Sequence, residues 1–135
     1  MTLRILSSSC LLTVAFALGA SACDDGEELG TEADRYGVGA ACTEDDHCRS
    51  PGLRCLDEFK GGYCGLEGCT ADADCPDGSA CVAHENGETY CFRICLDKAE
   101  CNLNRRSDDE SNCSANITFV EAPKAVKACV PPAGG

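Results

Sequence analysis

The sequence predicts a small disulfide-rich fold: tandem cysteine-stapled units with short β-hairpins, little helix and no large hydrophobic core. Three observations predict it. The chain of 135 residues contains 14 cysteines, a density typical of secreted disulfide scaffolds. Only 15 of the 94 residues from 38 to 131 are Leu, Ile, Val or Phe, which is too few to hold a fold by apolar burial alone. The spacing of the cysteines also repeats three times along the chain.

Residues 1–22 have the order of features that defines a secretory signal peptide. Met1–Arg4 is a short basic segment, Ile5–Ala17 is an apolar run, and Ala20-Ser21-Ala22 supplies small residues for cleavage. The apolar run is too short to span a bilayer, and no second run follows it. We therefore expect export to an oxidising compartment, where disulfides persist.

Cys23 follows this signal directly, and Ala20-Ser21-Ala22-Cys23 resembles a bacterial lipobox. The resemblance implies that Cys23 is lipidated and becomes the first residue of the mature protein. The same residues also fit an ordinary Ala-x-Ala cleavage site, so the alternative is a freely secreted protein. The cysteine count favours lipidation. Cleavage removes Cys10 with the signal, and a lipidated Cys23 cannot form a disulfide, so an even number of cysteines, 12, remains to pair.

Residues 23–37 are predicted to form an acidic, disordered tether behind the lipidated cysteine. Between Asp24 and Gly37 the chain has six acidic residues, one Arg and almost nothing apolar. Such a segment cannot bury enough surface to order itself. Removing residues 1–22, whose only charged side chain is Arg4, takes the formal net charge from −12 to −13. A chain this acidic repels nucleic acid, so no nucleic-acid partner is expected.

The rest of the chain divides into three cysteine-rich repeats, at 38–68, 69–94 and 95–135. Each begins with C-x5-C and continues with a third and a fourth cysteine. The third repeat is divergent, with the insertion "NLNRRSDDES" and a longer final arm. The predicted disulfide cysteines are Cys42, Cys48, Cys55, Cys64, Cys69, Cys75, Cys81, Cys91, Cys95, Cys101, Cys113 and Cys129. Four cysteines in a repeat allow three pairings, and spacing alone does not choose among them.

The segment from Cys69 to Cys81 reads C-x5-C-P-x-G-x-x-C. It resembles the four-disulfide core of whey acidic proteins, the N-terminal cysteine-rich domain of Dickkopf proteins and the EB modules of animal extracellular proteins. The four-disulfide core implies that the first cysteine pairs with the third and the second with the fourth. The pairs implied are Cys42–Cys55, Cys48–Cys64, Cys69–Cys81, Cys75–Cys91, Cys95–Cys113 and Cys101–Cys129. The whole arrangement also resembles cysteine-rich lipoproteins of predatory and soil-dwelling bacteria.

Turn residues predict one hairpin in each repeat, with glycine in the first two turns and proline in the third. Lys60-Gly61-Gly62 is expected to turn the first, and Asn86-Gly87 the second. "NITFV" (116–120) and "AVKACV" (125–130), on either side of Pro123, are expected to form the third. Tyr63 and Tyr90, each before a fourth cysteine, are expected to pack against the bridges.

The acidic residues of the C-x5-C loops raise the possibility of calcium binding. Asp72 and Asp74 begin a pattern that resembles part of a calcium loop, but Pro76 interrupts it and Ala83 stands where an EF-hand has Glu. We therefore expect these carboxylates to cap turns and expect no metal site.

Other short motifs indicate exposed chain rather than chemistry. His84 and Glu85 lack the second His of a zinc peptidase, and His47 is expected in a solvated loop. Cysteine-based zinc or redox sites are not expected, because no C-x-x-C pair occurs. Arg105-Arg106 is expected in a solvated or cleavable loop. Asn112 and Asn116 begin N-glycosylation patterns that matter only in a eukaryotic secretory pathway.

The sequence contains no nucleophile–base pair, no phosphate-binding glycine loop and no basic patch. We therefore expect a non-enzymatic protein without catalytic residues or cofactors. The expected location is the cell envelope or outer surface, as a lipoprotein held to the membrane by its N-terminal lipid, or the extracellular medium. The expected role is binding of an unknown protein or glycan partner. The alternative is a secreted disulfide-rich protease inhibitor or effector, with "RSPGLR" (49–54) as its exposed loop.

Overall fold

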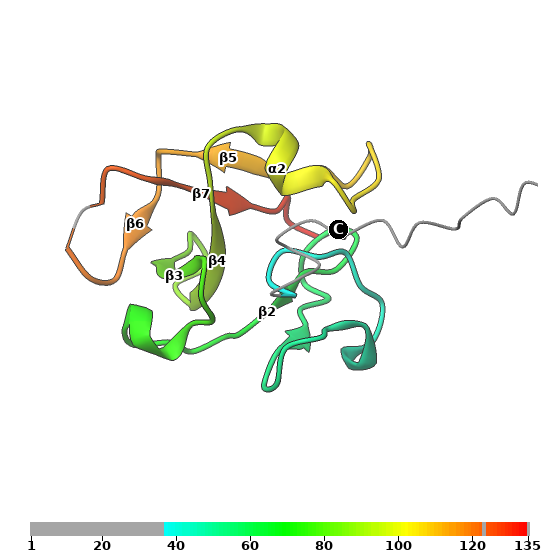
Figure 1. Cartoon of the computed structure of the whole chain (residues 1–135), viewed down its shortest axis with the longest axis horizontal. Helices are drawn as coiled ribbons and strands as arrows, with labels where there is room; N and C mark the ends of the chain where they lie inside the picture. Colours follow the sequence, from blue (N-terminus) through cyan, green and yellow to red (C-terminus); the bar gives the residue numbers. More distant parts are fainter. Residues whose placement is uncertain (1–36, 123, 135) are drawn as a thin grey trace, which may run out of the picture.

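The computed structural model describes residues 37–122 and 124–134, and this part of the chain is built from short elements (Figure 1). The predicted signal peptide, Cys23 and the tether up to residue 36 lie outside the described residues. Within the described part, no helix is long and apolar enough to cross a membrane. In chain order the elements are η1 (Asp45–His47), β1 (Arg54–Cys55), β2 (Cys64–Gly65), η2 (Asp72–Asp74), β3 (Ser79–Ala83), β4 (Thr89–Cys95), α2 (Lys98–Asn102), β5 (Asn112–Ser114), β6 (Thr118–Phe119) and β7 (Lys127–Val130).

Six disulfides hold these elements together, two in each repeat. In every repeat the first cysteine pairs with the third and the second with the fourth, as the resemblance to the four-disulfide core implies. The bridges are Cys42–Cys55, Cys48–Cys64, Cys69–Cys81, Cys75–Cys91, Cys95–Cys113 and Cys101–Cys129. A disulfide-rich fold with short strands and little helix is therefore what the chain adopts.

The same backbone turn recurs in all three C-x5-C loops, which form η1, η2 and the start of α2. In each loop the side chain just before the second cysteine accepts a hydrogen bond from the backbone N–H just after the first cysteine. The three bonds are Thr43 N to His47 Nδ1 (3.3 Å), Thr70 N to Asp74 Oδ2 (2.8 Å) and Leu96 N to Glu100 Oε2 (2.7 Å). A polar acceptor at this position closes the turn by satisfying a donor that the short helix leaves free.

The first two predicted hairpins are confirmed. In the first repeat β1 and β2 pair antiparallel, and Gly61 and Gly62 turn the chain at positive φ of 75° and 67°. In the second repeat β3 and β4 pair over five residues, and Gly87 adopts φ 90° in the turn. Asn86 Oδ1 accepts from the N–H of Glu88 at 3.1 Å, which closes the turn. A side chain at these φ values would be strained, so the turn glycines fix both hairpins.

The predicted third hairpin is wrong. Strands β6 and β7 do not pair with each other; they lie at separate places in a five-stranded sheet of order β5-β7-β4-β3-β6. β6 pairs with β3 of the second repeat, and β7 lies between β5 and β4. The β3–β4 hairpin had unpaired N–H and C=O groups along both edges, and strands of the third repeat satisfy them. The sheet thus joins the second and third repeats.

Alternation along the strands separates the sulfur atoms from the apolar core. Cys81 lies opposite Cys91, and Cys113 lies opposite Cys129, so these pairs share one face of the sheet. The neighbouring positions point to the other face, where Val82, Tyr90, Phe92 and Ala128 are buried. They form one small cluster with Val38, Leu53, Leu56, Phe59 and Tyr63 of the first repeat. This cluster is the contact between the first repeat and the sheet.

Tyr63 is a buried polar link in this contact. Its ring is fully buried, its hydroxyl accepts from the N–H of Arg93 at 3.1 Å, and it donates to the carbonyl of Cys129 at 3.3 Å. Tyr90 is also buried, although its hydroxyl accepts from Asn86 Nδ2 at 2.8 Å. The two tyrosines therefore belong to the core that joins the repeats, and Tyr90 points to the face opposite Cys91 instead of against its bridge as predicted.

Arg105 contradicts the expectation of a solvated basic pair. Only 8% of its surface is exposed, and its guanidinium crosses from the third repeat into the first. It donates to the carbonyls of Gly62 (2.8 Å), Lys60 (2.7 Å) and Asp109 (2.8 Å). Five donors in a rigid plane suit this set of backbone acceptors. Arg106 is the exposed member of the pair, with 82% of its side chain accessible.

Candidate binding pocket

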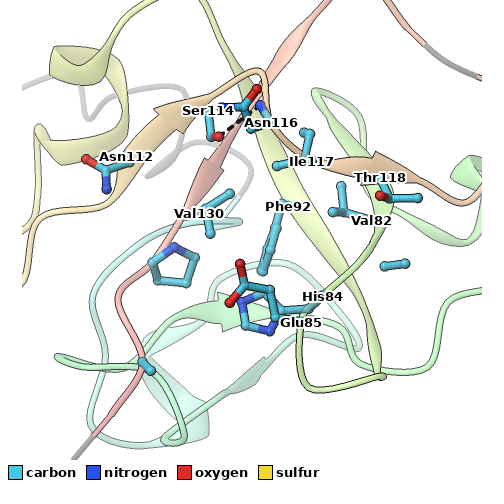
Figure 2. A pocket seen from close by; sticks show the side chains of 13 residues that line it. Val82, His84, Glu85, Phe92, Asn112, Ser114, Asn116, Ile117, Thr118 and Val130 are labelled. Carbon is cyan, nitrogen blue, oxygen red and sulfur yellow. Dashed lines mark hydrogen bonds between the residues drawn. The ribbon is translucent and has the colours of Figure 1, made fainter.

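A pocket of about 550 Å³ lies on the cysteine-free face of the sheet. All five strands contribute to it, through Val82 (β3), Phe92 (β4), Ser114 (β5), Thr118 (β6) and Val130 (β7). Figure 2 shows these side chains gathered around one opening, with Ser114, Asn116 and Ile117 at one end and His84 and Glu85 at the other. The volume is in the range of small-molecule sites.

The short connection between β5 and β6 explains why the sheet curves around a pocket at this place. These strands are the two edges of the sheet, yet only residues 115–117 separate them. Five strands side by side would place the edges about 19 Å apart in a flat sheet. A link of this length reaches at most about 14 Å. The sheet must therefore curl, and the pocket lies inside the curl. Ser114 Oγ holds the link by accepting from Asn116 N at 3.1 Å.

The floor of the pocket is apolar and rests on the aromatic cluster. Val82 and Phe92 are fully buried beneath it, and Ile117 and Val130 are partly buried beside them. At one end the imidazole of His84 packs edge-on against Phe59, Tyr90 and Phe92, with centroid distances of 5.5, 5.8 and 5.9 Å. Because the aromatic cluster and the bridges fix these side chains, the floor is preformed.

The rim of the pocket is polar. Asn112, Asn116 and Thr118 are exposed on the β5–β6 side, and Glu85 is exposed on the β3–β4 turn. Glu85 is the only Asp, Glu, Lys or Arg among the lining residues. The buried Nδ1 of His84 has no hydrogen-bond partner within the described part of the chain. The site therefore combines an apolar floor, neutral hydrogen-bonding groups and one negative charge.

Asp74 has the turn-capping role that the sequence predicts for both carboxylates, whereas Asp72 bonds to groups far from it in the chain. Asp72 Oδ1 accepts from the N–H of Cys81 at 3.0 Å, while its other oxygen pairs with Lys124. Asp74 Oδ2 accepts from Thr70 N, Thr70 Oγ1 and Ala71 N. The hydrogen bond and charge of Lys124 lower the pKa of Asp72, and the bonds from Thr70 lower the pKa of Asp74. Both carboxylates already have partners from the protein.

The remaining motifs lie in different places. The segment 49–54, expected to be an exposed loop, lies between bridged cysteines, but its Leu53 is buried and donates its N–H to the carbonyl of Ser50 in a tight turn around Gly52 at φ 84°. His47 is exposed and bonded within its own loop, as expected. His84, expected on the surface, is partly buried in the pocket wall.

Three sulfur atoms come together in each repeat because its two bridges lie side by side. The groups, each within 4.8 Å, are Cys42, Cys48 and Cys64; Cys69, Cys75 and Cys81; and Cys95, Cys101 and Cys129. Metal ions bind thiolates, and all of these sulfur atoms are in disulfides. The clusters are therefore part of the covalent framework.

Comparisons of the chain with models of known protein families, with curated proteins and with solved structures find no match.

Proposed function

We propose that this protein is a non-enzymatic, lipid-anchored extracytoplasmic protein that acts as a binding module at the cell surface. One observation carries the anchor: the framework uses all twelve cysteines from Cys42 to Cys129 in bridges within the repeats. Once the signal with Cys10 is removed, this sequence offers no further cysteine to pair with Cys23. An unpaired cysteine directly after a signal peptide calls for another use, and lipidation supplies it.

The disulfides themselves indicate an oxidising environment. The acidic residues 24–36 then act as a spacer between the lipid and the folded part. The binding role is supported by the pocket, because a site formed by all five strands on a cross-linked frame loses little freedom when a ligand enters. The twelve framework cysteines have a structural role, and the proposal includes no catalytic residue and no cofactor.

Metabolic labelling with palmitate in a bacterial host tests the anchor. The wild-type protein should carry the label and fractionate with membranes, and Cys23→Ala should lose both properties. Cys23→Ala should still fold with six bridges, because Cys23 is not part of the framework. An unlabelled wild-type protein, or a label that persists in Cys23→Ala, would contradict the lipid anchor.

A further inference from the structure

We infer that the pocket on the cysteine-free face of the sheet is a site for an alkylammonium group, with the cation against Glu85 and the apolar chain on the floor of Val82, Ile117 and Val130. This assignment rests on the proposed binding function and names the chemistry of its ligand. Figure 2 shows the arrangement that supports it: the carboxylate of Glu85 points into the opening beside Val130, and Ile117 lies toward the opposite end.

The negative charge at the pocket favours a cationic ligand. Among the described residues that line the pocket, Glu85 is the only Asp, Glu, Lys or Arg, so no lysine or arginine there offsets it. The protein around it has a formal net charge of −12. A cleft of one sign with low-dielectric walls concentrates the field and attracts ions of the opposite sign. An anionic ligand would meet repulsion from both the carboxylate and the whole molecule.

The shape and polarity of the pocket favour an aliphatic chain next to the cationic group of the ligand. Ile117 and Val130 are partly buried beside the opening, so an aliphatic chain that covers them removes their remaining apolar surface from water, while Val82 and Phe92 lie buried beneath. The ring of Phe92 is 0% exposed and offers no platform on which a sugar ring could stack. Asn112, Asn116 and Thr118 remain available at the rim to bond the polar groups next to the chain.

The charge on Glu85 is separable from the fold. Glu85 is exposed, and the turn that carries it is closed by backbone bonds from His84 N to Glu88 O (2.8 Å) and from Gly87 N to His84 O (3.0 Å). Glu85→Gln therefore removes the charge and retains the turn. Glu88 is an exposed carboxylate of the same turn that does not line the pocket, so Glu88→Gln is the matched control.

The test is titration of the full, oxidised mature chain with hexylammonium, followed by amide NMR, with mass spectrometry to verify six bridges. We expect shifts at Val82, Ile117 and Val130, weaker binding of the neutral 1-hexanol and no binding of hexanoate. Glu85→Gln should weaken hexylammonium binding about three- to tenfold, and added salt should weaken it in the wild type. Glu88→Gln should bind as the wild type does. Ile117→Ala should weaken hexylammonium and hexanol alike.

A second arm identifies the source of the ammonium group. If Nα-acetyl-lysine methylamide binds at the same residues, the ligand is a lysine side chain of a partner protein; if only hexylammonium binds, it is a free amine. Equal binding of hexanol and hexylammonium, unchanged affinity in Glu85→Gln, or glucose binding in place of both amines would overturn the assignment. None of these results depends on the lipid, so the pocket and the anchor fail independently.

Discussion

At the scale of single residues, the contact between the repeats depends on two buried polar side chains. Tyr63 and Arg105 each reach across from one repeat to backbone groups of another. Burial raises the pKa of Tyr63 to about 12, partly offset by its bond from Arg93 and by the charge of Arg105. Burying a polar group costs free energy, and burying it without a hydrogen-bond partner costs more. Removing one partner therefore leaves the other with its full desolvation penalty.

Arg105→Ala should destabilise the protein by about 2–4 kcal/mol, because four backbone carbonyls, three of them in the first repeat, would lose a charged donor. Arg106→Ala is the matched control and should change stability by less than about 0.5 kcal/mol, since its side chain is 82% exposed. Guanidinium denaturation with the disulfides intact measures both. Equal effects of the two substitutions would show that Arg105 is not a structural link.

The sequence does not show that Tyr63 and Arg105 link the repeats. Arg105 stands beside Arg106 in the polar segment "NLNRRSDDES", where nothing in the composition distinguishes a buried guanidinium from a solvated one. Its partners are carbonyls of Lys60 and Gly62, more than forty residues earlier, and a carbonyl gives no sequence signal. The sequence likewise predicts a surface position for His84, because its aromatic neighbours come from two other segments, Phe59 of the first repeat and Tyr90 and Phe92 on β4.

At the scale of elements, the C-x5-C loops are the part that local rules describe best. Each loop is one helical turn whose backbone donors need acceptors, and the Asp, Glu and His residues inside it supply them. Asn-Gly and Gly-Gly likewise fixed two hairpins through the φ values they permit. The third hairpin failed because turn signals describe only neighbours in sequence, whereas β6 and β7 pair with edges made earlier in the chain.

Asp72→Ala should lower stability by about 1 kcal/mol at pH 6, because Cys81 N–H and Lys124 lose their acceptor. The pKa of Asp72 is lowered in the folded protein, so its contribution is present above its unfolded pKa of about 3.9 and is lost as pH falls through the lower folded value. The difference in free energy of unfolding between wild type and Asp72→Ala should therefore become smaller below about pH 4.

Thermal unfolding from pH 6 to pH 2 measures that gap. Asp77→Ala, at an exposed position three residues after the end of η2, should follow the wild type throughout. A constant gap between wild type and Asp72→Ala at every pH would mean that the ionised carboxylate is not what stabilises the loop.

At the scale of the whole molecule, disulfides stabilise each repeat, and a small shared core holds the repeats together. The bridges close loops inside each repeat, with sequence separations of 12 to 28 residues. Each is worth roughly 3 kcal/mol through the unfolded chain. The sheet and the aromatic cluster then join the repeats, and the C-terminal residues return to the first repeat, where Gly134 N donates to the carbonyl of Glu58 at 2.7 Å.

Cysteine count and spacing predicted the fold class, and a family resemblance rather than the spacing predicted the pairing. The pocket was not predictable, because it depends on how β5 and β6 close the curl of the sheet. That closure requires strand pairs between repeats, and no local pattern encodes such pairs. Residues such as Ile117 and Val130 read only as members of a hairpin that does not form.

The central claim is that disulfides, more than apolar burial, keep this chain folded, and full reduction tests it most directly. The natively purified protein should show no alkylation at the twelve cysteines from Cys42 to Cys129 under non-reducing conditions. After complete reduction in the absence of denaturant it should lose amide NMR dispersion. A well-dispersed spectrum that survives reduction of all six bridges would contradict the claim.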